Sequence, residues 1–282
     1  MSKITRETRG LLYQLYKLMH KRELEPAEGI TLDVVIPVLE KDLRVLPLCL
    51  EGVRKCVNHT LGKIYIVSPP SETIRNFCRE YGTEFVDENT VLGYSARDIN
   101  FVTDAGIDRS GWIFQQLVKL SGALGQNRYY LVIDADHVLL NPHTFIARDG
   151  RLVFYRSSEY HVPYYNNIEV LTGYCDYGFF TFSYVTHKMI FDKELLADLR
   201  KILEEKSGKR WDKAIVESLD SGEMSPFSEF ELYGNFVPDE RKVSLPWRTK
   251  SMSYARLDAY DKLQAKYGRR YLAVTFPDYY NR

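Results

Sequence analysis

Apolar runs of strand length alternate with helical stretches through the first half of the chain. Two prolines end the run "KIYIVSPP", because proline cannot continue a strand ladder, and Ser71 and Gly82 bracket a helical stretch as N-cap and helix stop. The alternation predicts a parallel sheet with right-handed crossovers. The expected elements are strands at 32–38, 63–70, 83–88 and 129–133 and helices at 43–57, 71–82 and 111–124, with a polar loop at 89–110.

Beyond Pro142 the pattern is looser. "RLVFYRS" and "FFTFSYVTH" have the composition of strands, and 192–208 has the apolar spacing of an amphipathic helix. Residues 246–282 are basic and rich in tyrosine.

The stretch "ITRETRGLLYQLYKLMHKRELE" near the N-terminus predicts an amphipathic helix with basic flanks. Two interpretations stay open. The helix could lie on an anionic membrane surface, or it could pack on the domain or on a partner chain, which Glu7, Glu23 and Glu25 favour because they dilute its positive charge.

Charge and cysteine usage exclude some classes of protein. The 38 basic and 38 acidic side chains cancel, so the chain lacks the basic excess typical of nucleic-acid binding. None of the four cysteines forms a C-x-x-C pair, so the sequence has no zinc-binding spacing. No run of about 18 apolar residues occurs, so we expect no membrane-spanning helix. We therefore expect a cytosolic protein with reduced thiols, in contact with the inner membrane face only if the N-terminal helix binds there.

The most informative stretch is "YYLVIDADHVLLNP" at 129–142, where a strongly apolar strand ends on Asp134 and Asp136. If the strand persists, residues two apart point to the same side, with Cα atoms roughly 6.5–7 Å apart, and if it breaks into a turn, the two aspartates can converge further. In open α/β sheets, ligands bind at the carboxyl ends of the strands. Paired carboxylates repel unless a proton or cation lies between them, so the pair predicts a Mg²⁺ or Mn²⁺ site that carries a diphosphate.

Five segments in order, "LDVVIPV", "IYIVSPP", "GWIFQQLVKL", "YYLVIDADHVLLNP" and "FSEFELYGNF", resemble a bacterial glycosyltransferase-like family with the GT-A fold. The resemblance spans about residues 32–240, and its most specific pieces are "GW-x-x-QQ-x-x-K" and "SE-x-ELYG". It implies an α/β fold with a mixed, mostly parallel sheet flanked by helices, and a nucleotide-diphosphate sugar donor with a UDP-sugar as first choice. The implied division is an N-terminal helix in 1–30, a nucleotide-sugar half at 31–142, an acceptor half at 143–245 and an extension at 246–282.

The resemblance also implies roles for single residues. Pro37, Val38 and Ser68 would line the pocket for the nucleobase and ribose. His187 would join the aspartate pair at the metal, and an imidazole ligand suits Mn²⁺ better than Mg²⁺.

A polar stripe follows helical spacing at Trp112, Gln115, Gln116 and Lys119. Buried polar groups need partners, which a sugar and a diphosphate would supply. Arg109, just before this helix, could also reach phosphates. A solvated helix face is the alternative.

Transfer to a hydroxyl acceptor with inversion needs a base, and the preferred candidate is Glu229, with Glu231 and Asp176 as alternatives. Ser228 could instead cap a helix whose third residue, Glu231, completes a capping box. Tyr164, Tyr165, Tyr174 and Tyr177 could stack against an acceptor glycan.

The predicted function is a metal-dependent, hexosyltransferase-like glycosyltransferase that acts on a glycan or lipid-linked acceptor in bacterial surface polysaccharide synthesis. An aspartyl-phosphate phosphatase is one alternative, although its aspartate pair usually follows the first strand. A non-catalytic sugar- or nucleotide-binding protein is another.

Overall fold

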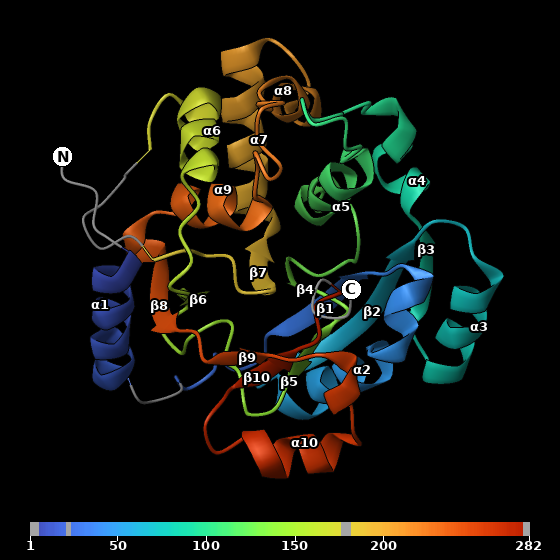
Figure 1. The fold of residues 1–282 in the computed structure, drawn as a ribbon, viewed down its shortest axis with the longest axis vertical. Coiled ribbons are helices and arrows are strands. Elements are labelled where there is room, and N and C mark those ends of the chain that lie inside the picture. The colour runs from blue at the N-terminus through green and yellow to red at the C-terminus, as the bar shows by residue number, and fades with distance from the viewer. Residues whose placement is uncertain (1–5, 21–23, 176–181, 279–282) are drawn as a thin grey trace.

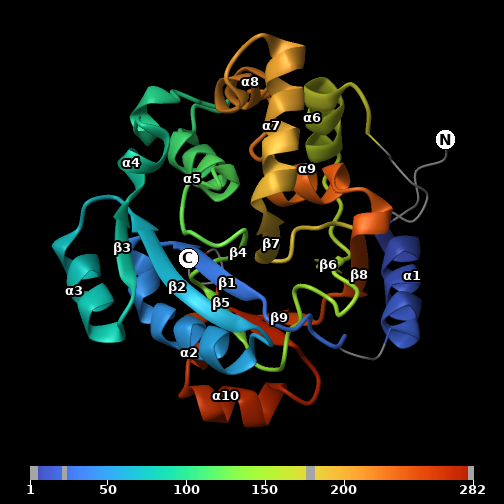
Figure 2. The same ribbon diagram turned by 180° about the vertical axis from the view of Figure 1, so that it is seen from behind.

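The computed structural model describes residues 6–20, 24–175 and 182–278. A central five-stranded sheet has the order β3-β2-β1-β4-β7 (Figures 1 and 2). Strands β3, β2, β1 and β4 are parallel, and β7 pairs antiparallel with β4. The predicted fold class, a mixed and mostly parallel sheet flanked by helices, is confirmed.

The described helices are α1 Arg6–Met19, α2 Leu46–Cys56, α3 Glu72–Tyr81, α4 Glu88–Leu92, α5 Ser110–Leu120, α6 Val162–Thr172, α7 Lys193–Ser207, α8 Trp211–Glu217, α9 Glu229–Phe236 and α10 Tyr260–Tyr267. The strands are β1 Thr31–Pro37, β2 Thr60–Ser68, β3 Glu84–Asp87, β4 Tyr129–Ile133, β5 His137–Leu139, β6 Leu152–Arg156, β7 Lys188–Asp192, β8 Lys242–Pro246, β9 Thr249–Ser251 and β10 Ala273–Thr275.

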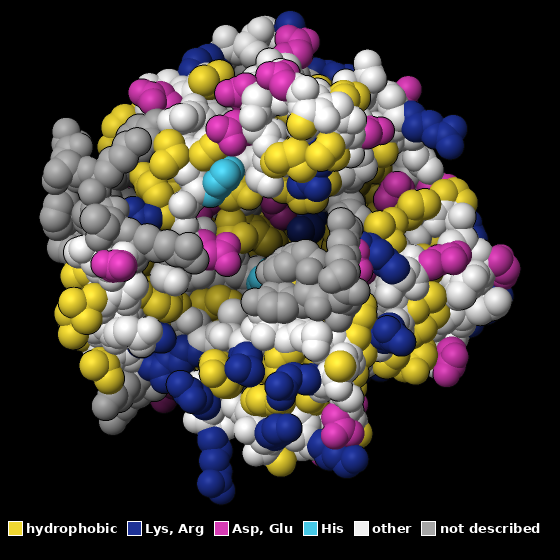
Figure 3. Space-filling view, viewed as in Figure 1, with side chains coloured by type: hydrophobic (Ala, Val, Ile, Leu, Met, Phe, Trp, Pro, Cys, Tyr) yellow, Lys and Arg dark blue, Asp and Glu magenta, His cyan; other side chains and the backbone are white. Residues whose placement is uncertain are grey.

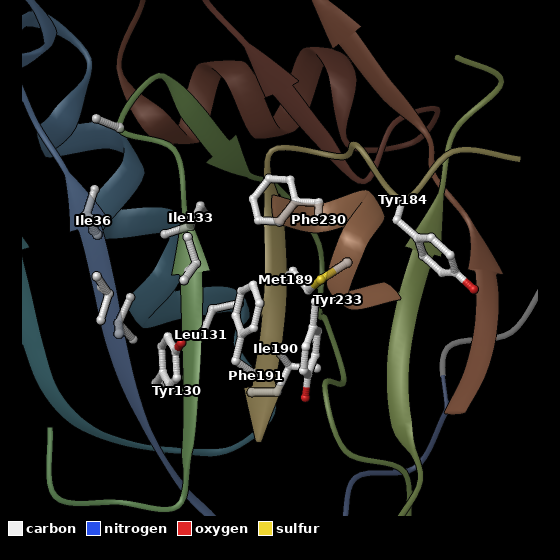
Figure 4. Close-up of a cluster of buried hydrophobic side chains, with 14 of the residues drawn as sticks. Ile36, Tyr130, Leu131, Ile133, Tyr184, Met189, Ile190, Phe191, Phe230 and Tyr233 are labelled. Carbon is white, nitrogen blue, oxygen red and sulfur yellow. The ribbon is translucent and has the colours of Figure 1, made fainter. Parts of the chain in front are cut away.

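Helices cover both faces of the central sheet. α2 lies on one face with α10 beyond it, and α5, α7 and α9 lie toward the other (Figure 1). Figure 4 shows the apolar core between β1, β4, β7 and α9, with Leu131, Phe191, Phe230 and Tyr233 among its side chains.

Residues 246–278 are joined to the centre of the fold. β10 pairs antiparallel with β5 and parallel with β9, so a small second sheet links this region to the segment that follows β4. The backbone N–H of Phe276 donates to the carbonyl of Asp136 over 3.0 Å. This region therefore supports the turn that carries the aspartate pair.

Several predicted elements differ from the structure. The helix expected at 43–57 begins at Leu46, after a 3₁₀ turn at Glu40–Arg44. The helix expected at 111–124 ends at Leu120, because Arg200 caps the Leu120 carbonyl over 2.6 Å and Gly122 adopts a φ of 54°. The start of the expected loop at 89–110 overlaps α4, which begins at Glu88 and which Asp87 caps by accepting from the N–H of Asn89.

The strand expected at 179–187 is wrong for its described part, 182–187, which lies outside the named strands. Ser183 forms an isolated antiparallel bridge with Ser157, and side chains bind the backbone on either side of it: Arg156 Nε donates to the Phe182 carbonyl over 2.7 Å, and Glu231 accepts from the Tyr184 N–H over 3.1 Å. The strand begins at Lys188, and all its residues are buried, so it lacks the polar alternation of a half-exposed strand.

Candidate metal centre

The aspartate pair lies in a tight turn at the carboxyl end of β4. The strand ends at Ile133, and the N–H of His137 donates to the Asp134 carbonyl over 3.0 Å, which closes the turn. The strand therefore ends before the first aspartate, both aspartates lie in the turn, and their carboxylates converge.

His187 lies beside the pair at the start of β7. It adopts a left-handed backbone conformation with a φ of 63°, which is uncommon for a residue other than glycine. Its carbonyl accepts from the N–H of Asp134 over 2.9 Å, and its Nδ1 lies 3.2 Å from Asp134 Oδ2. One ligand atom from each of Asp134, Asp136 and His187 lies within 4.8 Å of the others.

The donor atoms fit a divalent cation. Oδ1 of Asp136 is buried and has no hydrogen-bond partner within the described parts of the chain. Burial raises the pKa of Asp136 to about 6, and the neighbouring Asp134 and Asp42 carboxylates add to the rise against the opposing effect of His187. Two carboxylates and an imidazole suit Mn²⁺, and their excess negative charge gives a cation a stabilising role.

Lys119 connects this cluster to α9. Its Nζ lies 2.7 Å from Asp134 Oδ1 and 2.9 Å from Glu229 Oε1, and its side chain is only 10% exposed. Burial would lower the pKa of Lys119, but the two carboxylates hold it above its ordinary value. Lys119 and His187 in turn hold the pKa of Asp134 below its ordinary range, against the effect of burial.

The remaining predicted residues of α5 lie at different depths. Gln116 is buried, and its Oε1 accepts from the N–H of Glu229 over 3.3 Å, so it fixes the start of α9. Trp112 and Gln115 are half-buried, and Arg109 lies 4.3 Å over the Trp112 ring while its Nε donates to the Met224 carbonyl. Within the described residues, Lys119 and the Oε1 of Gln116 thus have protein partners, whereas the buried Nε2 of Gln116 has none.

Glu229 and Glu231 are both buried, in different surroundings. Burial raises the pKa of Glu229, and Lys119 opposes the rise. Ser228 is the N-cap and accepts from the N–H of Glu231, but the Glu231 carboxylate binds the Tyr184 N–H and the Tyr165 hydroxyl. The predicted Ser228 N-cap is therefore present. The Glu231 carboxylate binds the backbone of the 182–187 segment from inside the protein.

The acceptor-side residues are dispersed. Tyr165 is fully buried, whereas Tyr174 is 73% exposed, and Tyr164 is half-buried beside His161. Asp176 and Tyr177 lie outside the described residues.

Pro37, Val38 and Ser68 are buried at the carboxyl ends of β1 and β2. The Ser68 hydroxyl donates to the carbonyl of Pro69 over 2.8 Å, so it has a partner within the protein. Their role in binding a nucleotide stays a prediction.

Figure 3 shows the surface hollowed near the centre of this face, with acidic, basic and histidine side chains around the hollow. Sequence reasoning missed Asp42, whose negative charge acts on Asp136. Its position shortly after the first predicted strand could have marked it as a candidate site residue, because ligands bind at the carboxyl ends of strands in open α/β sheets.

Three solved structures are similar to this chain at low identity. The apo form of mouse xyloside xylosyltransferase 1 is 13% identical with a TM-score of 0.49, and covers 87% of this chain and 97% of its own. The galactosyltransferase LgtC with donor and acceptor sugar analogs is 12% identical with a TM-score of 0.42, covering 87% of each chain. The glucosyl-3-phosphoglycerate synthase of Mycobacterium tuberculosis, with Mn²⁺, UDP and glucosyl-3-phosphoglycerate, is 13% identical with a TM-score of 0.38, covering 94% of this chain and 81% of its own.

At these identities and TM-scores the likeness carries no conclusion about activity. No curated protein sequence matches the chain. A family model described as "Family of unknown function (DUF6492)" matches residues 30–272. That match includes the whole central sheet and the metal-ligand cluster, and the chain belongs to the family of unknown function DUF6492.

Proposed function

We propose that this protein is a metal-dependent glycosyltransferase that moves a sugar from a nucleotide-diphosphate sugar, with a UDP-sugar as first choice, to a hydroxyl of a glycan or lipid-linked acceptor. The observation that carries the proposal is the Asp134, Asp136 and His187 cluster, whose ligand atoms lie within 4.8 Å. It follows a parallel strand at the carboxyl edge, where ligands of open α/β sheets bind. The resemblance of the ordered motifs to a bacterial glycosyltransferase-like family supports the same activity, and the surface polysaccharide acceptor is proposed from that family resemblance alone.

The chemistry that Mn²⁺ or Mg²⁺ would supply when bound is neutralisation of a diphosphate, both on binding and as it leaves. Asp134, Asp136 and His187 would hold the ion. Lys119 fixes the Asp134 carboxylate in place over 2.7 Å, so the site is ordered before any ligand arrives. This ordering reduces the cost of assembling the charged site.

Glu229 is the proposed base for the acceptor hydroxyl. Its carboxylate is 4% exposed and lies 2.9 Å from Lys119, so an acceptor hydroxyl must approach it through a narrow opening in the surrounding side chains. Burial raises the pKa of Glu229, which makes its carboxylate a stronger base than an ordinary glutamate.

A thermal-shift panel of nucleoside diphosphates and nucleotide sugars, each with and without Mn²⁺, tests the proposal. A bound ligand raises the melting temperature by mass action. We expect a rise with one nucleotide that requires Mn²⁺ and is lost in Asp136→Asn. Asp198→Asn on the exposed face of α7 is the matched control and should keep the rise.

The panel is combined with an assay on p-nitrophenyl phosphate. If the wild type hydrolyses this compound and the Asp134→Asn variant does not, the protein is a phosphatase and the proposed transferase activity is wrong. Binding of a nucleotide that is independent of Mn²⁺ and of Asp134 would replace it with a binding protein without a metal centre.

A further inference from the structure

The outer face of α1 carries an apolar stripe. Leu11, Leu15, Leu18 and Met19 are 65%, 49%, 62% and 79% exposed, and they follow the three- and four-residue spacing of one helix face. Large apolar side chains exposed together are typical of a surface that contacts an apolar partner.

The opposite face of α1 fixes the helix to the protein. Tyr13 is 6% exposed, and its hydroxyl donates to the Arg156 carbonyl over 2.7 Å. Tyr16 stacks on Phe182 with ring centroids 5.1 Å apart, and Arg9 lies 3.7 Å over the Tyr160 ring. The expectation that α1 packs on the domain is therefore correct for this face, and the leucine stripe is left for another contact.

A cationic cluster, defined as Lys17, Arg248, Arg269 and Arg270, lies beside the stripe. Arg248 donates to the Lys17 carbonyl, and all three arginines line a cavity of about 280 Å³ together with His20. Burial, Arg248 and Arg270 lower the pKa of Lys17, so these positive charges act on one another. Within the described residues, none of the four forms an ion pair with an acid.

The stripe and the cationic cluster lie next to each other, because Arg248 binds the backbone of Lys17, which precedes Leu18. In Figure 3, hydrophobic atoms lie at the edge that α1 occupies in Figure 1, and Lys and Arg atoms spread from there toward α10. Because the whole chain has a formal net charge of zero, this gathering of cations is a local feature of the surface.

We propose that the outer face of α1 and the cationic cluster together form a docking surface for an anionic lipid bilayer. The leucine side chains would enter the boundary between headgroups and acyl chains, and the cations would contact anionic headgroups. No helix among the described residues is long and apolar enough to cross a membrane, so the contact would be made at the bilayer surface. The surface shares no residue with the metal-ligand cluster, so this inference is tested independently of the proposed transferase activity.

Co-sedimentation of the full chain with vesicles tests the proposal. The vesicles are pure phosphatidylcholine, or phosphatidylcholine with about 30 mol % phosphatidylglycerol, at about 0.1 M and about 0.5 M NaCl. We expect binding to the anionic vesicles at low salt, and a fall of about tenfold or more at high salt or without phosphatidylglycerol.

Two sets of variants separate the apolar and cationic parts. Leu11→Gln/Leu15→Gln/Leu18→Gln and Arg269→Gln/Arg270→Gln should each lower the affinity for anionic vesicles about tenfold or more, because the first removes apolar groups that enter the bilayer and the second removes cations that contact its headgroups. Arg269→Lys/Arg270→Lys should retain most of the affinity, because the charge is kept. Val102→Gln/Ile107→Gln changes side chains 46% and 45% exposed in another loop, and should leave binding unchanged.

The proposal is overturned if the wild-type chain does not sediment with anionic vesicles, or sediments equally with neutral ones. Unchanged binding in the leucine variant, with its melting temperature retained, would also overturn it. So would a wild-type dimer in size-exclusion chromatography that the leucine variant converts to a monomer, since the stripe would then bind a second copy of this chain.

Discussion

At the scale of single residues, Lys119 is the most consequential side chain of the candidate site. It is buried between Asp134 and Glu229, and each carboxylate lies within 2.9 Å of its Nζ. Removing one member of a buried charged group leaves the others without compensation, which is costly.

Lys119→Met should therefore lower the free energy of unfolding by about 3–5 kcal/mol. Adding Glu229→Gln should recover about 1 kcal/mol or more of this loss, because it removes one uncompensated carboxylate. Urea unfolding of both single variants and the double variant measures the coupling.

The control is Lys201→Met, in an exposed pair whose atoms are 3.8 Å apart. It should change stability by less than about 0.5 kcal/mol. A Lys119→Met variant as stable as this control would contradict a structural role for the buried lysine.

At the scale of elements, the turn that carries the aspartates depends on how closely α2 approaches β5. A Cβ added at Gly52 would lie 2.7 Å from the Leu139 carbonyl oxygen and 2.9 Å from its nitrogen. Both are backbone atoms of a paired strand, so they cannot move aside without disturbing the sheet.

Gly52→Ala should lower the free energy of unfolding by about 2–3 kcal/mol. It should also weaken Mn²⁺-dependent nucleotide binding, because β5 begins one residue after Asp136. Gly111→Ala at the start of α5 meets open space and should raise stability by roughly 0.5 kcal/mol, so chemical unfolding of the two variants should shift in opposite directions.

His59 joins the α2–β2 connection to the segment before β6. Its Nε2 accepts from the N–H groups of Phe145 and Ile146 over 3.0 and 3.1 Å, and burial lowers its pKa to about 4. The unfolded chain, with a pKa near 6.5, takes up the proton first as the pH falls. The stability that His59 contributes is thus present above pH 6.5 and lost toward pH 4.

His59→Gln keeps an acceptor and removes the titration. Between pH 7 and pH 5, the free energy of unfolding of the His59→Gln variant should fall by about 1 kcal/mol less than that of the wild type. This value allows for solvent screening of the half-buried ring. Guanidinium unfolding at both pH values measures the difference. Identical losses in the two proteins would show that His59 does not set the acid sensitivity.

At the scale of the whole molecule, the sequence predicted the parallel core and the position of the aspartate pair. The spacing of hydrophobic residues and the length of apolar runs can be read from neighbouring residues in the sequence, and β1, β2 and β4 follow these signals. The start of β7 at Lys188 was missed for two reasons. A fully buried strand has no alternation of apolar and polar residues, and the backbone of the preceding segment, 182–187, is bound by side chains from β6 and α9. The Lys119–Glu229 pair and the charge of Asp42 on Asp136 depend on tertiary contacts that no local pattern records.

The pairing of β10 with β5 also has a consequence for the order of folding. Residues 273–275 bind residues 137–139, and Phe276 binds Asp136, so these contacts join segments far apart in the chain. Contacts of high sequence separation form slowly, because the loop between them must close first. In refolding experiments, recovery of helical circular dichroism should therefore precede recovery of the proposed Mn²⁺-dependent nucleotide binding, because the parallel pairing of β1, β2 and β3 can form before the pairing of β5 with β10 fixes the turn that carries the aspartates.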